Sequence, residues 1–134
     1  MEWKLEVIPV PVADIDRGKA FYADKLGFAV DLDMELAPGQ RMVQLTSPGS
    51  GCSVHLRSGA ADVSTAPVRG LQLVVTEIEA ARAELIGRGF DPGPVHQFVD
   101  GGRRDGPGGN YNAFLVVDDP DGNGWAAQEI AAGA

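Results

Sequence analysis

The chain has 134 residues and a formal net charge of −8 at pH 7, and it contains 18 glycines and 9 prolines. This length suits one domain or two closely packed half-domains, and it is enough to bury a core without disulfides. The acidic charge argues against nucleic acid and anionic membranes as partners, because phosphate groups are bound by clusters of Lys and Arg. The densest basic spot is Arg103-Arg104, and Asp100 and Asp105 flank it.

The sequence predicts a cytoplasmic protein. Cys52 is the single cysteine, so no intrachain disulfide can form, which fits a reducing compartment. The N-terminal residues lack the basic start and apolar run of a signal peptide. Apolar runs also stay far short of the roughly 20 residues that a membrane helix needs.

The first half of the chain predicts a strand followed by a helix. Residues 3–12 are rich in Val and Ile, which is typical of a strand. Within residues 13–28, either Asp14 or Asp16 can cap a helix, and Gly27 can end it.

The same pattern returns in residues 71–90, where strand, acidic cap, helix and glycine recur. Three strand candidates follow each helix: 28–34, 41–46 and 53–57 in the first half, and 93–99, 112–117 and 124–130 in the second. Each half therefore predicts a βαβββ module. One such module cannot bury its sheet face alone, so the two should pair.

The repeat divides the chain into a first module at residues 1–58, a linker at 59–68 and a second module at 69–134. The linker is small and polar. The two modules are expected to form one compact domain.

Three segments carry a resemblance to a known superfamily: VADIDRGKAFYADKLGF, VVTEIEAARAELIGRGF and, before the last strand, DPDGN. In this order they resemble the vicinal oxygen chelate superfamily of glyoxalase I, bleomycin-resistance proteins and extradiol dioxygenases. The resemblance implies an α+β fold in which two tandem modules form a cup-shaped, partly open mixed sheet with helices outside. It also implies a cavity inside the cup and a homodimer, and it leaves open whether modules swap between subunits.

Enzymes of that superfamily hold a divalent metal through side chains of the first and last strand of each module. Counting from the motifs puts Val7, Gly70 and Ala126 at three of the four positions. The fourth is His55 if the preceding glycine-rich turn has one extra residue, and Val54 if it does not. Because Val, Gly and Ala offer no side-chain ligand and a catalytic site needs about three, we expect no metal and no other cofactor. A divalent metal would fit only if this register were wrong.

Strand alternation predicts the side chains that line the cup. The set is apolar with a few amides and one histidine, as is usual for a small-molecule pocket: Val7, Met42, Gln44, His55, Gln72, Phe114 and Gln128. Of these, His55 is the candidate for acid/base chemistry. The glycine-rich segment 100–112 predicts a long loop, which adds Arg103 and Tyr111 as ligand contacts. His96 is expected either in solvent or at the mouth of the cavity, and Trp3 either stacks on a ligand or packs between modules.

Three functions fit this pattern, and the third requires no small-molecule ligand. The first is a metal-free protein that sequesters a small molecule, aromatic or cationic, as a bleomycin-resistance protein does. The acidic charge would help it to attract cations. The second is a superfamily enzyme, a lyase, isomerase or dioxygenase, that uses an unconventional metal site or His55 as acid/base. The third is a degenerate homologue that binds a partner protein. The ligand itself is not identified by the sequence.

Overall fold

The structure is a computed structural model that describes residues 1–57 and 65–133. Residues 59–64 of the predicted linker therefore lie outside the described residues. The chain divides into two compact units, Met1–Val68 with Asp119–Asn123, and Arg69–Asp118 with Gly124–Ala134. The short segment Asp119–Asn123 thus belongs to the first unit although it lies late in the sequence.

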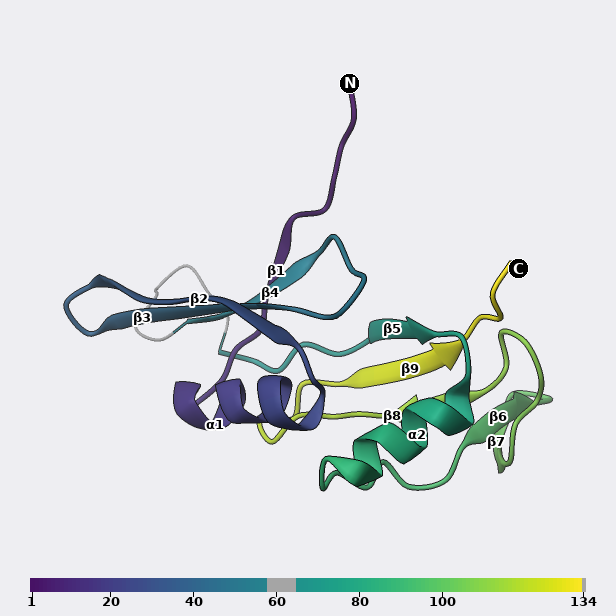
Figure 1. Cartoon of the computed structure of the whole chain (residues 1–134). Helices are drawn as coiled ribbons and strands as arrows, with labels where there is room; N and C mark the ends of the chain where they lie inside the picture. Colours follow the sequence, from purple (N-terminus) through teal and green to yellow (C-terminus); the bar gives the residue numbers. More distant parts are fainter. Residues whose placement is uncertain (58–64, 134) are drawn as a thin grey trace. The chain divides into compact units, whose positions relative to one another are not determined.

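The first unit contains a mixed four-stranded sheet (Figure 1). Its elements are β1 (Val7–Pro9), α1 (Ile15–Ala20), the π-helical turn η1 (Phe21–Lys25), β2 (Ala29–Ala37), β3 (Gln40–Thr46) and β4 (Ser53–Arg57). The strand order is β1-β4-β3-β2, with β1 parallel to β4 and the other pairs antiparallel. Strand β1 is much shorter than the strand predicted at residues 3–12, because its pairing with β4 covers only Val7–Pro9 among the described residues.

The first helix begins at a side-chain cap and packs closely on its sheet. Asp14 is the cap, because its Oδ1 accepts a hydrogen bond from Arg17 N at 3.2 Å. A β-carbon on Gly18 would lie 3.1 Å from Leu56 Cδ1, so glycine lets α1 approach β4. After η1 the helical segment ends at Gly27, where φ is 75°.

The second unit contains a mixed five-stranded sheet and one helix, and with the first it confirms the predicted α+β class. Its elements are β5 (Leu71–Val75), α2 (Ile78–Gly87), β6 (His96–Val99), β7 (Gly102–Asp105), β8 (Phe114–Val116) and β9 (Trp125–Glu129). The strand order is β5-β9-β8-β6-β7. Helix α2 lies against β8 and β9 (Figure 1). Its N-terminus is capped from the sheet, because Glu129 Oε2 accepts a hydrogen bond from Ile78 N at 2.8 Å.

One prediction for this unit is wrong. The segment 100–112 is not a continuous loop, since β7 pairs antiparallel with β6 and forms a hairpin. Asp100 and Gly101 turn the chain with φ of 51° and 77°. Two successive positive φ angles match the right-handed twist of the flanking strands. The Asp-Gly dipeptide is the sequence signal that predicts such a turn.

The carboxylate of Asp119 is buried in the first unit and accepts four hydrogen bonds. Its Oδ2 accepts from Tyr22 Oη at 2.6 Å and from Asn123 Nδ2 at 2.7 Å. Its Oδ1 accepts from the backbone N–H groups of Asp121 and Asn123, both at 2.9 Å. A buried charge is tolerated when hydrogen bonds replace its hydration. The Asp119 carboxylate therefore has a structural role: it holds this turn in the first unit.

Asn123 extends this network to two further segments of the unit. The side chain is fully buried. Its Nδ2 donates to the Pro11 carbonyl at 2.8 Å, and its Oδ1 accepts from Val68 N at 2.9 Å. The segment before α1, the helical segment and Val68 are thus all joined to one turn, which explains why Asp119–Asn123 belongs to this unit.

Replacing Tyr22 with Phe tests the Asp119 network. The substitution removes one donor from a buried carboxylate and leaves the ring in place, so we expect the free energy of unfolding to fall by about 1.5–3 kcal/mol. Chemical denaturation measures this. Tyr111→Phe is the control, because it removes the same hydroxyl from a side chain that is 52% exposed. Equal losses in the two variants would contradict the account.

Candidate functional site

Each sheet has one face toward its own helix and an opposite face that this helix does not cover. In the first unit, Val43, Leu45, Val54 and Leu56 are buried on the helix side. We call the opposite side the first open face. Its side chains are Val7, Pro9, Leu32, Met34, Met42, Gln44, Thr46, Ser53, His55 and Arg57.

The first open face brings together four of the predicted ligand contacts, namely Val7, Met42, Gln44 and His55. The structure also answers the question of register in β4. His55 pairs with Gln44 on the open face, whereas Val54 pairs with Leu45 and is buried on the helix side. Of the two candidates for the fourth position, His55 therefore lies on the open face and Val54 does not.

A continuous row of hydrogen bonds runs across the first open face. His55 Nε2 lies 2.8 Å from Gln44 Oε1, and Gln44 Nε2 lies 3.5 Å from Ser53 Oγ. Ser53 Oγ lies 2.6 Å from Thr46 Oγ1, which in turn donates to the carboxylate of Asp31. We call these five side chains the polar row. Apolar side chains of the same face, such as the half-exposed Leu32 and Met34, accompany this ordered set of polar groups.

Sequence reasoning named none of Thr46, Asp31 and Ser53 as a ligand contact. Simple alternation from His55 puts Ser53 on the same face, so that signal was present. Asp31 had no such signal, because a register shift between Val30 and Leu32 interrupts the alternation of β2. A bulge of this kind re-aims side chains in a way that a period of two does not predict.

The surroundings of His55 favour the neutral form of its imidazole. Burial lowers its pKa from the usual value, and the positive charge of Arg57 lowers it further. Its side chain is only half-buried, so a small molecule can still reach the ring. A neutral, positioned imidazole can accept one hydrogen bond and donate another.

The second sheet has its own open face, opposite α2. Its side chains are Gln72, Val74, His96, Phe98, Arg103, Asp105, Phe114, Val116, Ala126 and Gln128. This second open face brings together the predicted contacts Gln72, Phe114 and Gln128. Gln72 Nε2 donates to Gln128 Oε1, and Gln128 Nε2 donates to the Tyr111 carbonyl at 2.9 Å. The side chain of Tyr111 itself is exposed.

Three rings cluster on the second open face. His96 stacks on Phe114 with centroids 6.0 Å apart, and Phe98 meets both rings edge-on at 5.7 and 5.4 Å. Phe98 is 49% exposed, so the aromatic cluster of His96, Phe98 and Phe114 reaches the surface. Sequence reasoning did not name Phe98 as a ligand contact, although alternation along the strand puts it on the same face as His96.

His96 is buried rather than in solvent, which was one of the two placements left open. Burial is the main cause that lowers its pKa, and the positive charge of Arg103 adds to it. The Pro94 carbonyl and the Asp105 carboxylate act in the opposite direction. Its Nδ1 has no hydrogen-bond partner among the described residues. Leaving a buried acceptor or donor unpaired costs about 1–3 kcal/mol.

The residues at the positions of the superfamily's metal ligands do not fit a metal. Val7 and Ala126 lie on the open faces of their sheets, and Gly70 directly precedes β5. None of the three has a side-chain donor. Within 1–57 and 65–133, no group of three or more His, Cys, Asp or Glu side chains could hold a metal ion.

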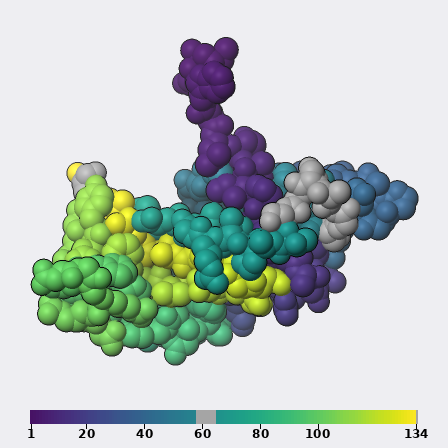
Figure 2. Space-filling view, turned by 180° about the vertical axis from the view of Figure 1, so that it is seen from behind, coloured from purple at the N-terminus to yellow at the C-terminus, as the bar shows by residue number. Residues whose placement is uncertain are grey.

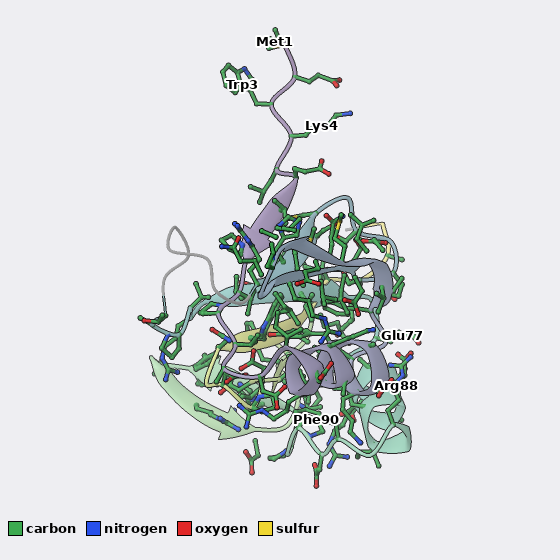
Figure 3. All side chains as sticks on the ribbon, turned by 90° about the vertical axis from the view of Figure 1, so that its left-hand side faces the viewer. Met1, Trp3, Lys4, Glu77, Arg88 and Phe90 are labelled. Atoms are coloured by element: carbon green, nitrogen blue, oxygen red, sulfur yellow. The ribbon has the colours of Figure 1, made fainter. Side chains whose placement is uncertain are left out.

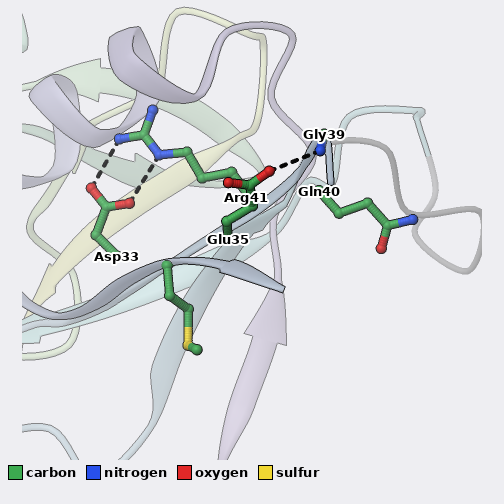
Figure 4. A pocket seen from close by; sticks show the side chains of 6 residues that line it. Asp33, Glu35, Gly39, Gln40 and Arg41 are labelled. Atoms are coloured by element: carbon green, nitrogen blue, oxygen red, sulfur yellow. Dashed lines mark hydrogen bonds and ion pairs between the residues drawn. The ribbon is translucent and has the colours of Figure 1, made fainter. Parts of the chain in front are cut away.

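A separate hollow of about 410 Å³ lies at the hairpin between β2 and β3 (Figure 4). Arg41 donates to both carboxylate oxygens of Asp33 at 2.9 Å, and Glu35 accepts from Gly39 N at 3.0 Å. The Arg41 guanidinium and the Lys19 ammonium hold the pKa of Asp33 well below its usual range. Because these charges pair with one another, the hollow is a weaker candidate site than either open face.

The described helices are all too short or too polar to cross a membrane.

The described residues form two compact units, each with one sheet, in a small α+β protein. Residues 4–127 match the model of the Glyoxalase/Bleomycin resistance protein/Dioxygenase superfamily. The chain belongs to this superfamily, as the resemblance of its motifs predicts.

Solved structures of the same superfamily are similar over nearly the whole chain. TnmS3, an antibiotic binding protein from Streptomyces sp. CB03234, is 25% identical with a TM-score of 0.72, over 97% of this chain and 98% of that one. A glyoxalase/bleomycin resistance protein from the same Streptomyces strain is 26% identical with a TM-score of 0.69, over 94% and 100%. A superfamily member from Sphaerobacter thermophilus DSM 20745 is 23% identical with a TM-score of 0.68, over 96% and 98%. The comparison with curated proteins gave no match.

Proposed function

We propose that this chain is a metal-free small-molecule-binding protein that sequesters an aromatic compound. The observation that carries the proposal is the aromatic cluster on the second open face. Phe98 is about half exposed there, next to Phe114 and to an unpaired, buried nitrogen of His96. A flat ligand would cover the rings, and a polar group on it could satisfy the nitrogen.

The first open face supports the same function with different chemistry. It combines exposed apolar side chains, Leu32 and Met34, with the polar row. Small-molecule sites are usually apolar with a few fixed polar groups, because the apolar part supplies affinity and the polar part supplies orientation. The similarity to TnmS3, whose name describes an antibiotic binding protein, is in line with this proposal.

The overall charge favours a cationic or neutral ligand over an anionic one. At −8, the chain raises the local concentration of cations and repels anions. Arg103 adds a positive charge on the second open face, but Asp105 on the same face offsets it.

An enzyme that uses His55 as acid/base is the alternative. The favouring observations are that His55 is hydrogen-bonded and only half-buried, and that burial lowers its pKa. The two functions differ in what happens to the bound compound. A sequestering protein returns the compound unchanged, whereas an enzyme converts it, and mass spectrometry of the compound after incubation separates the two.

We also propose that the chain forms a homodimer in the cytoplasm. Residues 1–6 extend away from the rest of their unit (Figures 2 and 3). Trp3 is 92% exposed and Leu5 is 68% exposed. They alternate with Lys4 and Glu6, as in a strand with one apolar side. Two large apolar side chains in water favour burial against a second copy of the chain. The single cysteine fits a reducing compartment.

Replacing both Trp3 and Leu5 with Ser tests the dimer. Because the substitutions remove the apolar side of the extended segment, we expect the dimer dissociation constant to rise by about tenfold or more. Light scattering coupled to size exclusion measures the mass. Ile86→Ala removes an exposed apolar side chain of α2 and should leave the dimer intact. A wild-type monomer, or an unchanged dimer in the double variant, would contradict the proposal.

Replacing Phe98 with Ala tests the ligand site. Acridine orange, a planar aromatic cation, serves as the probe, and its fluorescence reports binding. We expect Phe98→Ala to weaken binding by about tenfold, since it removes a stacking surface. Ile86→Ala is the matched control, because it removes a similarly exposed apolar side chain from α2. Equal affinity in the wild type and Phe98→Ala would place the probe elsewhere and remove the main support for the proposal.

A further inference from the structure

The hydrogen bonds of the polar row can point in only one direction. A carboxylate accepts hydrogen bonds and has none to donate, so the hydroxyl of Thr46 must donate to Asp31. A hydroxyl has one hydrogen. Thr46 therefore accepts from Ser53, whose Oγ is 2.6 Å away, and the hydrogen of Ser53 is used in that bond.

This direction continues through Gln44 to His55. Since Ser53 has no second hydrogen to donate, Gln44 must present its Nε2 to Ser53 Oγ, which is the orientation in the structure at 3.5 Å. Gln44 Oε1 is then the atom that faces His55 Nε2, at 2.8 Å. An amide oxygen accepts, so His55 Nε2 carries the hydrogen. A neutral imidazole has one N–H group, which leaves a lone pair on Nδ1.

The lone pair on Nδ1 is accessible. Among the described residues, the buried side-chain nitrogen and oxygen atoms without a partner are His96 Nδ1 and Asp121 Oδ2. His55 Nδ1 is not one of them, and no described residue donates a hydrogen bond to it. The atom therefore reaches the surface of the half-buried ring.

We propose that the polar row fixes His55 Nδ1 as a hydrogen-bond acceptor for a ligand that presents an O–H or N–H group from an apolar body, such as a phenol. The proposal rests on the proposed small-molecule function and names the ligand class at the first open face. The apolar body would lie against the exposed Leu32 and Met34 of β2. Asp31, at the far end of the row, acts as a positioning residue, because it sets the tautomer of His55 without contact to the ligand.

The tautomer of His55 is measured by long-range proton–nitrogen NMR on nitrogen-15-labelled, ligand-free protein. The chain has 2 histidines, so His96→Phe assigns the spectrum by removing one of them. We expect His55 in the wild type as the pure Nε2–H tautomer. In Asp31→Asn the new amide can donate to Thr46 and allow the reverse direction, so a mixture with the Nδ1–H tautomer should appear.

Asp24→Asn is the matched control for this measurement. It removes the same charge from an exposed carboxylate of the same unit, outside the polar row. The tautomer of His55 should stay as in the wild type. A mixture in the wild type, or an Asp31→Asn spectrum identical to that of Asp24→Asn, would overturn the directional row.

Naphthol and its methyl ether test the ligand class, because they share a ring and differ in the O–H donor. We expect naphthol to shift the Nδ1 resonance of His55 and to bind about tenfold more tightly than the ether, the worth of about one hydrogen bond. The difference should vanish in His55→Phe. Equal binding of both probes would overturn this inference and leave the proposed function standing. Binding of neither probe would count against both.

Discussion

The buried carboxylate of Asp119 is the interaction on which the first unit depends. A short turn from late in the sequence enters a unit built from the start of the chain, and it stays there because four donors replace the water that the carboxylate loses. Asn123 then ties the same turn to Pro11 and Val68. In this superfamily the acidic DPDGN motif precedes the strand that bears a metal ligand. Here its first residue, Asp119, has a structural role through its buried carboxylate. Seven residues beyond Asp119 stands Ala126, which has no donor to offer.

The open faces of the two units have different chemistry. In the first, a carboxylate orders hydroxyl, amide and imidazole groups into a row that ends at His55. In the second, the same face of the sheet holds the aromatic cluster and two amides. The first open face has polar groups that can orient a ligand through hydrogen bonds, and the second open face has rings that can contact a ligand. That combination supports the proposal of a small-molecule-binding protein more than that of a metal enzyme.

The sequence predicts much of this architecture, because the fold rests on local patterns. The acidic caps, the helix stripes and the glycine stops mark both modules, and the α+β class and the superfamily are confirmed. The alternation of β3 correctly groups Met42 and Gln44 on one face. Two features were not predicted for physical reasons. The bulge in β2 brings Asp31 to the polar row against the alternation. The hairpin at Asp100 was hidden within a glycine-rich segment, although its Asp-Gly turn is a recognised signal.

The most direct test of the central claim is to measure acridine orange affinity and metal content on the same untagged protein, purified without chelator and then dialysed against EDTA. The account predicts metal far below one atom per chain before dialysis and the same affinity before and after it. A stoichiometric divalent metal whose removal abolishes binding would contradict the account. In that case the protein would have to hold a metal through residues other than Val7, Gly70 and Ala126, and the enzyme alternative would take precedence.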